Sequence, residues 1–115
     1  MSARSYIHAL ARQAVKRALE IDPSYYAAHL FLAEIEMSEG RPGVAVPHFK
    51  AASVSPVRRF RARVGLARAY VELGDLARAR HLLDALAAER PNDPRVRQIG
   101  DQISRELRRA QGRGK

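Results

Sequence analysis

The chain contains no cysteine and no tryptophan. The absence of cysteine excludes disulfide bonds, thiolate metal sites and a cysteine nucleophile. Aromatic residues are few, with four tyrosines and three phenylalanines, and no stretch approaches the roughly 20 apolar residues that a membrane-spanning helix needs. The first residues, Met1 to Tyr6, are followed by His8, Arg12 and Lys16, so they lack the apolar centre of a signal peptide. The default expectation is a cytoplasmic protein without membrane contact.

Acidic residues are also scarce, because 12 aspartates and glutamates stand against 21 lysines and arginines, which gives a net charge of +9. This charge attracts acidic proteins, nucleic acid or anionic lipid, although an arginine-rich solvated surface explains it equally well. The segment from Arg58 to Arg68 holds five arginines, but it lacks the stacking aromatics of a specific nucleic-acid reader. Packing explains its aromatic residues, Phe60 and Tyr70, so nucleic acid is not the expected partner.

Catalytic and metal-binding patterns are absent from the sequence. The four histidines, at positions 8, 29, 48 and 81, include no pair at the close spacing that places two ligands on one helix face. No nucleophile motif accompanies them, and the acidic residues fall mainly at turns rather than in the pairs that acid and base catalysis uses. We therefore expect a protein that is not an enzyme and needs no metal or other cofactor, with histidines that lie on the surface or take part in packing.

Alanine, leucine, arginine and glutamate dominate the chain, a composition typical of helices. Apolar residues recur at steps of three and four through six segments, and each segment ends at a proline, a glycine or a polar turn. The pattern predicts an all-α protein with helices over residues 3–21, 25–38, 42–54, 57–73, 76–89 and 94–109. Ser24 is the expected N-cap of the second helix, and Asn92 or Asp93 that of the sixth.

A spacing of 34 residues relates equivalent positions along the chain without a gap. It connects Ala11, Ala45 and Ala79; Val15, Phe49 and Leu83; Leu32 and Leu66; Ala33 and Ala67; and Gly40 and Gly74. A period of this length indicates stacked units of secondary structure, because each unit buries its apolar face only against its neighbours. The predicted fold is therefore an array whose exposed surface carries the function.

The two middle units resemble the tetratricopeptide repeat, a helix–turn–helix unit of 34 residues. The first unit has the matching residues Leu32, Ala33, Gly40, Ala45, Phe49 and Ala52. The second unit has Leu66, Ala67, Tyr70, Gly74, Ala79, Leu83 and Pro91. The resemblance covers about residues 9 to 107 and implies a right-handed solenoid of helical hairpins, with about six helices.

The period divides the chain into a half repeat over residues 6–23, repeats over 24–57 and 58–91, and a C-terminal capping helix over 94–109. Gly100 and Asp101 lie where the earlier repeats have a Leu-Ala pair, which suits a terminal helix with one solvent-exposed side. The basic tail, residues 110–115, is expected to be disordered. Subtracting 34 from Gly40 gives Tyr6, so the first repeat lacks its first helix. We expect either a piece of a larger array, from an assembly or biogenesis protein, or a natural N-terminal cap.

The resemblance also implies a concave groove, lined by the first helices of successive repeats, that holds a peptide or protein segment. The residues that it places there are Leu30, Glu34, Met37, Arg61, Val64, Arg68, Arg95 and Gln98. Because arginine forms paired hydrogen bonds with carboxylates, an acidic segment or a C-terminal carboxylate fits this set. Some members clamp a terminal carboxylate with lysines and asparagines. Here Leu30, Glu34, Val64 and Arg68 occupy those places, so that clamp is not expected.

The sequence therefore predicts a scaffold or adaptor that binds a partner protein, and it leaves two alternatives. In the first, the uncovered N-terminal helix packs against another copy and the protein forms a homo-oligomer. In the second, which the sparse aromatics disfavour, the basic helical array binds nucleic acid.

Overall fold

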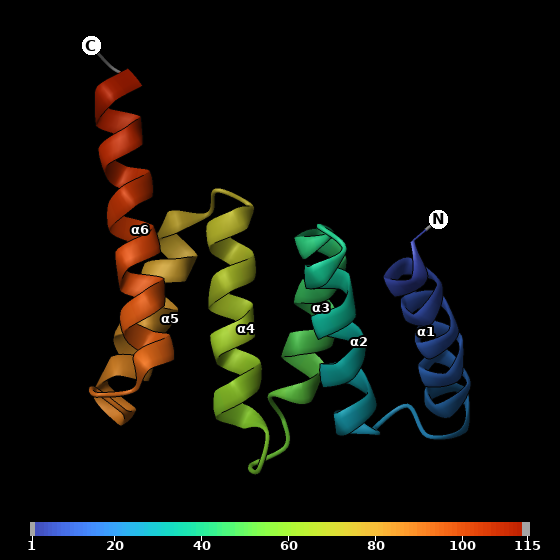
Figure 1. Cartoon of the computed structure of the whole chain (residues 1–115). Helices are drawn as coiled ribbons and strands as arrows, with labels where there is room; N and C mark the ends of the chain where they lie inside the picture. Colours follow the sequence, from blue (N-terminus) through green and yellow to red (C-terminus); the bar gives the residue numbers. More distant parts are fainter. Residues whose placement is uncertain (1, 114–115) are drawn as a thin grey trace.

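The computed structural model describes residues 2–113, which form six helices. They are α1 (Ala3–Ile21), α2 (Tyr26–Ser38), α3 (Pro42–Ala52), α4 (Arg59–Glu72), α5 (Leu76–Glu89) and α6 (Pro94–Arg113). Each helix packs against the next in the chain, so the N- and C-terminal helices lie at opposite ends of the molecule (Figure 1). The predicted all-α fold of six helices is confirmed.

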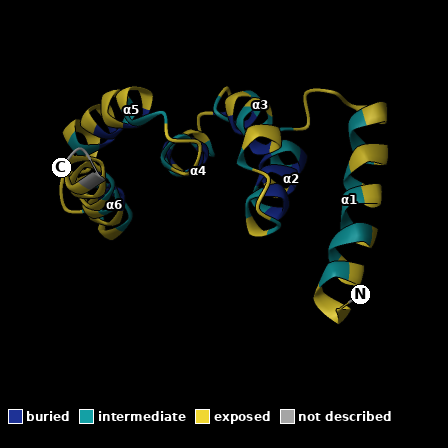
Figure 2. Ribbon diagram, turned by 90° about the horizontal axis from the view of Figure 1, so that it is seen from above, coloured by how far each residue is buried: buried dark blue, intermediate teal, exposed yellow. Residues whose placement is uncertain are grey.

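The helices form two layers. Seen from above, α2, α4 and α6 lie in one layer and α3 and α5 in the other, while α1 stands at one end (Figure 2). Contacts between α2 and α4, and between α4 and α6, join helices that are not consecutive in the chain. The arrangement follows from the repeat, because equal units of 34 residues stack so that the first helix of each lies beside the first helix of the next.

Glycines at equivalent positions end the first helices of the two repeats. Gly40 and Gly74 have φ values of 76° and 79°, a left-handed conformation that side chains disfavour. After α2, the amide of Arg41 donates to the carbonyl oxygen of Glu36 at 2.8 Å, and after α4 the amide of Asp75 donates to that of Tyr70 at 2.9 Å. These bonds close the same C-terminal turn in both repeats, so the hairpins bend at the same point.

Several predicted helix ends differ from the structure, since α3 ends at Ala52 instead of residue 54 and α4 begins at Arg59 instead of residue 57. Two further errors have identifiable reasons. Ser24 does not cap α2, because its hydroxyl donates to Asp22 Oδ1 at 2.7 Å and the N-cap position belongs to Tyr25, which makes no side-chain cap bond. The tail predicted to be disordered is helical as far as Arg113, since α6 continues past Arg109. Residues 114 and 115 lie outside the described part of the chain. Asp93 does serve α6 as expected, by accepting from the amide of Arg95 at 2.9 Å.

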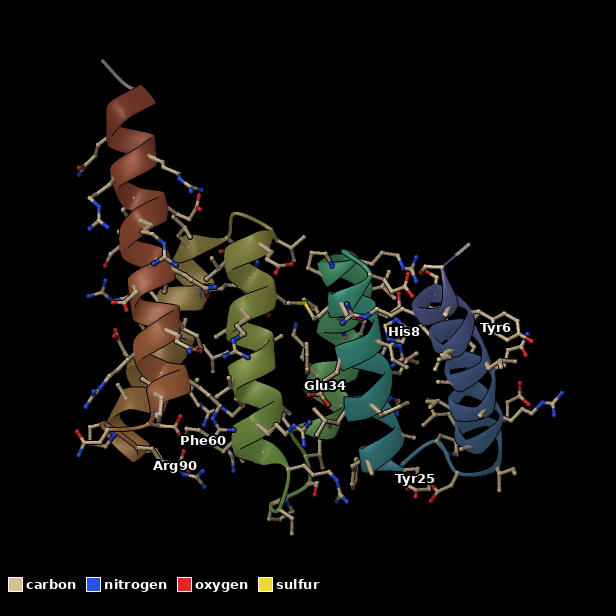
Figure 3. The ribbon with its side chains drawn as sticks, in the orientation of Figure 1. Tyr6, His8, Tyr25, Glu34, Phe60 and Arg90 are labelled. Carbon is tan, nitrogen blue, oxygen red and sulfur yellow. The ribbon has the colours of Figure 1, made fainter. Side chains whose placement is uncertain are left out.

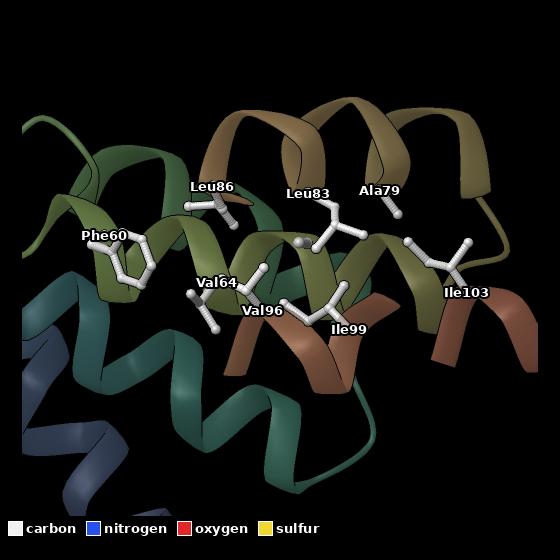
Figure 4. Close-up of a cluster of buried hydrophobic side chains, with 9 residues drawn as sticks. Phe60, Val64, Ala79, Leu83, Leu86, Val96, Ile99 and Ile103 are labelled. Carbon is white, nitrogen blue, oxygen red and sulfur yellow. The ribbon is translucent and has the colours of Figure 1, made fainter. Parts of the chain in front are cut away.

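The core is divided between two clusters that meet at α4. One joins α2, α3 and α4 through Leu30, Ala33, Ala45, Phe49, Ala52, Ala62 and Leu66. The other joins α4, α5 and α6 through Phe60, Val64, Ala67, Ala79, Leu83, Leu86, Val96, Ile99 and Ile103 (Figure 4). Alanines related by the period are fully buried in both clusters. Their small side chains allow the helices to approach closely, which explains why alanine recurs at these positions.

Helix α1 has no buried residue, and polar contacts contribute to its attachment to α2 and to the turn after α2. Arg12 Nε donates to Glu36 Oε1 on α2 at 2.7 Å, and His8 Nδ1 lies 3.1 Å from Glu39 Oε1. Helix α1 is therefore the least firmly packed helix of the array.

Candidate functional site

A groove opens between the first helices α2, α4 and α6, and we call it the central groove. Its volume is about 390 Å³, and its walls are formed by Glu34, Met37, Ser38, Phe49, Arg61, Val64, Gly65, Arg68, Glu72 and Arg95. Figure 3 shows Glu34 on the side of α2 that faces α4. The groove thus has a floor of carbon atoms and a charged rim, an arrangement suited to a peptide rather than to a small apolar ligand.

The structure brings most of the predicted site residues together in this groove. Six of them line it: Glu34, Met37, Arg61, Val64, Arg68 and Arg95. Gln98 lines an adjacent polar pocket of about 370 Å³ that shares Arg68 with the central groove. Leu30 does not line the groove, because it is 6% exposed and packs in the core between α2, α3 and α4. Val64 lines the wall but is only 2% exposed, so it shapes the groove more than it offers contact area.

Phe49 and Gly65 form part of the floor that the sequence did not predict. Phe49 belongs to α3, a second helix, and reaches the groove because Gly65 on α4 has no side chain in its path. The signal was present in the sequence, since the 34-residue period places Gly65 in line with Phe31 and Ile99, two large residues. A glycine at that position indicates a close approach of another group to the helix backbone.

Arg61 forms an ion pair with a carboxylate of the protein itself. Its Nη2 atom lies 2.8 Å from Oε2 and 3.0 Å from Oε1 of Glu34, across the groove on α2. This pair links the two first helices at the rim. Since both side chains remain partly exposed, the pair contributes little to stability but lowers the positive charge offered to a ligand.

Arg95 is likewise paired, at the start of α6. Its Nη2 atom donates to Asp93 Oδ2 at 2.8 Å, and this hydrogen bond lowers the pKa of Asp93 to about 2. The guanidinium carbon also lies 5.0 Å from the centre of the Phe60 ring, and that of Arg90 lies 3.9 Å from the same centre. Figure 3 shows Phe60 and Arg90 close together at the lower left of the view, near the start of α6. Arg95 is held in place by these contacts and is not free to neutralise an acidic ligand.

Arg68 differs from the other two groove arginines in its partner. Its Nη2 atom donates to the amide oxygen Oε1 of Gln98 at 3.1 Å, and within residues 2–113 it forms no ion pair with a carboxylate. The adjacent polar pocket adds Asp101, Gln102 and Arg105 from α6. Because the amide carries no charge, Arg68 is the one of these three arginines without an ion pair, and it is the best placed of them to receive an anionic group.

An ionic cluster around the buried Glu36, which the sequence did not predict, joins α1, α2 and the turn after α2. Glu36 is 3% exposed and binds both Arg12 and Arg41, with Oε2 2.6 Å from Arg41 Nε. The hydrogen bonds from Arg41 and Arg12 hold the pKa of Glu36 below its usual value in spite of burial. The Nη2 atom of Arg12 is buried without a hydrogen bond and lies 3.7 Å from Glu39 Oε1. The cluster is structural, because the charges of Arg12 and Arg41 are balanced within the protein by those of Glu36 and Glu39.

Two histidines that lie 19 residues apart in sequence meet between α2 and α3. The Nδ1 atoms of His29 and His48 are 3.0 Å apart, and His29 Nε2 donates to the carbonyl oxygen of Pro23 at 2.9 Å. Because one Nδ1 must accept while the other donates, the pair tolerates one extra proton but not two. Burial and the neighbouring His29 lower the pKa of His48, which also faces Glu36 and Lys16.

We expect the thermal stability of the protein to fall as the pH is lowered from 7.5 to 5.5. The pKa of His48 is lower in the folded than in the unfolded state, where it is 6.5. The unfolded state therefore binds more protons as the pH falls through 6.5, and the free energy of unfolding decreases. Melting temperatures of the wild-type protein and of His48→Gln measure this effect. A wild-type curve that is flat in this range, or a His48→Gln curve with the same slope, would contradict it.

The described part of the chain contains neither a cluster of metal-binding side chains nor a helix that could span a membrane. Among residues 2–113, no group of three or more histidine, aspartate or glutamate side chains is arranged to hold a metal ion. No helix in the same range is long and apolar enough to cross a bilayer.

Comparison with protein families agrees with the geometry of the fold and groove. Residues 37–103 match a family model described as tetratricopeptide repeat, and residues 8–56 match a second model with the same description. No curated protein matches the chain in sequence. Repeats of this kind generally mediate protein–protein interactions and are typically not catalytic. On the basis of its period, its helical hairpins and these matches, the chain belongs to the tetratricopeptide repeat family.

Proposed function

We propose that the protein is a scaffold or adaptor that binds an acidic segment of a partner protein in the central groove. The observation that carries the proposal is the state of Arg68, a guanidinium at the groove wall whose partner is the neutral amide of Gln98. The other groove arginines, Arg61 and Arg95, are paired with Glu34 and Asp93. A carboxylate of the partner would pair with Arg68 as Glu34 pairs with Arg61 and as Asp93 pairs with Arg95.

The apolar floor supports an extended peptide rather than an isolated anion. Met37 lies beside the charged rim and is partly exposed, whereas Phe49 and Val64 are each 2% exposed and shape the floor, so a segment with an apolar side chain next to an acidic one contacts Met37 and the rim. Beyond Arg68, the adjacent pocket offers the amide groups of Gln98 and Gln102, which both donate and accept hydrogen bonds. Such groups match the main chain of an extended peptide. The segment is therefore expected to run from the central groove toward α6.

Selection from a random peptide library tests this proposal. The wild-type protein is used for capture, and enriched peptides are measured by fluorescence polarisation against wild type and Arg68→Met. We expect enrichment of peptides that carry aspartate or glutamate near an apolar residue, and binding at least about tenfold weaker to Arg68→Met. Arg80→Met is the matched control, because Arg80 pairs with Asp84 on α5 and does not line the groove.

The outcomes separate the proposal from its alternatives. Enrichment of peptides without acidic residues, or equal binding to wild type and Arg68→Met, would show that Arg68 is not the anchor. A failure to enrich any peptide would show that the central groove is not a peptide site. Glu34→Gln provides a further check, since it releases Arg61 from its partner and should strengthen the binding of acidic peptides.

A further inference from the structure

One face of α1 carries an apolar stripe that no other part of residues 2–113 covers. Ile7, Leu10 and Ile21 are 61%, 51% and 87% exposed, and Ala14 between them is also exposed. Their spacing of three, four and seven residues places them on the same side of the helix. Tyr6, at the edge of the stripe, is 59% exposed and projects from α1 away from α2 (Figure 3).

The apolar surface is wider than the stripe alone. A pocket of about 360 Å³ between α1 and α2 continues it, with walls formed by Ala14, Val15, Ala18, Tyr25, Ala27, Ala28 and Phe31. Tyr25 and Phe31 are each 50% exposed, so their rings extend this surface at the α2 side. Apolar residues gathered on one surface mark a site of association more often than scattered ones do. The end of the array formed by α1 is therefore built to pack against another helix.

The opposite end of the array does not fit this surface. Helix α6 corresponds to the first helix of a repeat, and α1 corresponds to a second helix, so stacking copies head to tail would place α6 against α1. The exposed side of α6 carries Arg97, Asp101, Arg105 and Arg108. Contact with the apolar stripe would remove these charges from water without giving them partners. Head-to-tail assembly is therefore disfavoured.

The apolar residues of the stripe are instead arranged symmetrically on either side of Ala14, so the stripe can pack against the same stripe of a second copy. When two copies of α1 cross in antiparallel orientation at Ala14, residues whose numbers sum to 28 face each other. Ile7 then faces Ile21 of the second copy, Leu10 faces Ala18, and the two Ala14 side chains meet at the crossing. Large side chains thus oppose large or small ones, and the small residue lies where the helices are closest. Antiparallel helix dipoles add a favourable interaction.

The polar residues beside the stripe are also compatible with this crossing. Arg17 comes near Gln13 of the second copy, and the Tyr6 hydroxyl comes near the carboxylate of Glu20 of the second copy. No like charges face each other, in spite of the net charge of +9 on each chain. From these features we infer that the protein forms a two-fold symmetric homodimer through α1, centred on Ala14. The two central grooves remain open in this dimer, because they are lined by α2, α3, α4 and α6.

The first test is the mass of the full chain in solution as a function of concentration. The stripe is short, so we expect a dissociation constant on the order of 10 µM and a mass that rises toward twice 12.8 kDa. Ala14→Glu should keep the mass of a monomer, about 12.8 kDa, over the same range, because it places two carboxylates at the crossing. Ala14 is exposed in the monomer, so the variant is expected to fold, and its circular dichroism spectrum checks this.

The second test fixes the orientation. The chain has no cysteine, so Ala14→Cys introduces a single thiol, and the proposed crossing brings the two thiols within disulfide range. Diamide oxidation should convert most of Ala14→Cys to a covalent dimer, whereas Arg108→Cys on α6 should cross-link poorly. A monomeric mass at about 200 µM would overturn the proposal. So would a dimer that persists in Ala14→Glu, or equal cross-linking of the two cysteine variants, since each points to another interface.

Discussion

Gly65→Ala is expected to lower the free energy of unfolding by about 1–3 kcal/mol. In an exposed helix the same change stabilises by up to about 1 kcal/mol, because alanine is the better helix former. At Gly65 a new Cβ atom would overlap with Cε1 and Cζ of the Phe49 ring and lie 2.9 Å from its Cδ1. Phe49 is 2% exposed and packs in the core of α2, α3 and α4, so moving the ring away from Gly65 disrupts its contacts there. Chemical denaturation measures the change.

Gly100→Ala is the matched control, since Gly100 also lies within a helix. A Cβ atom there would lie 3.7 Å from Leu83 Cδ2, an ordinary van der Waals contact. This variant should therefore be as stable as the wild type or more stable, by up to about 1 kcal/mol. Adding Phe49→Leu to Gly65→Ala should cost less than the sum of the two single changes, because the smaller side chain relieves the overlap. Equal effects of the two glycine substitutions would contradict the close packing of Phe49 on α4.

The sequence predicts the fold well because its strongest signals are the turn glycines and the 34-residue period. The backbone conformation of the two turns requires glycine at positions 40 and 74. The period that relates these two glycines also relates buried alanines on neighbouring helices. Helix ends are less predictable, because a cap depends on competing hydrogen bonds. Ser24 binds Asp22 instead of capping α2, and α6 continues as a helix through Gly112 to Arg113.

The candidate site is predictable only where it follows the period. Counting along the first helices identified Arg61, Arg68 and Arg95, which the structure places around the same groove. It did not reveal that Glu34 pairs with Arg61 and Asp93 with Arg95, because side-chain rotamers and distances decide which charges pair. Contacts between distant parts of the sequence also escaped prediction. The histidine pair of α2 and α3 and the Arg12–Glu36 contact join residues 19 and 24 positions apart, with no spacing rule to connect them.

Glu36→Gln is expected to lower the free energy of unfolding by about 3 kcal/mol and to loosen α1. The glutamine keeps the size of Glu36 but loses its charge, so Arg12 and Arg41 lose their common carboxylate. One of the two guanidinium groups would face the amide nitrogen, which cannot accept a hydrogen bond. The charge of Arg12, which is 20% exposed, would then be compensated only by Glu39 at 3.7 Å. Chemical denaturation measures the loss.

The distribution of the loss distinguishes this cluster from an ordinary contribution to the core. Because α1 has no buried residue of its own, we expect hydrogen exchange in α1 to accelerate far more than in α4, α5 and α6. Asp84→Asn is the matched control, since it removes an exposed carboxylate paired with Arg80 and should cost less than about 0.5 kcal/mol. If exchange accelerates equally in all helices, the Glu36 cluster stabilises the whole array rather than α1. If α1 is unaffected, its attachment depends on Ala11, Val15 and their apolar neighbours, and the ionic contacts are secondary.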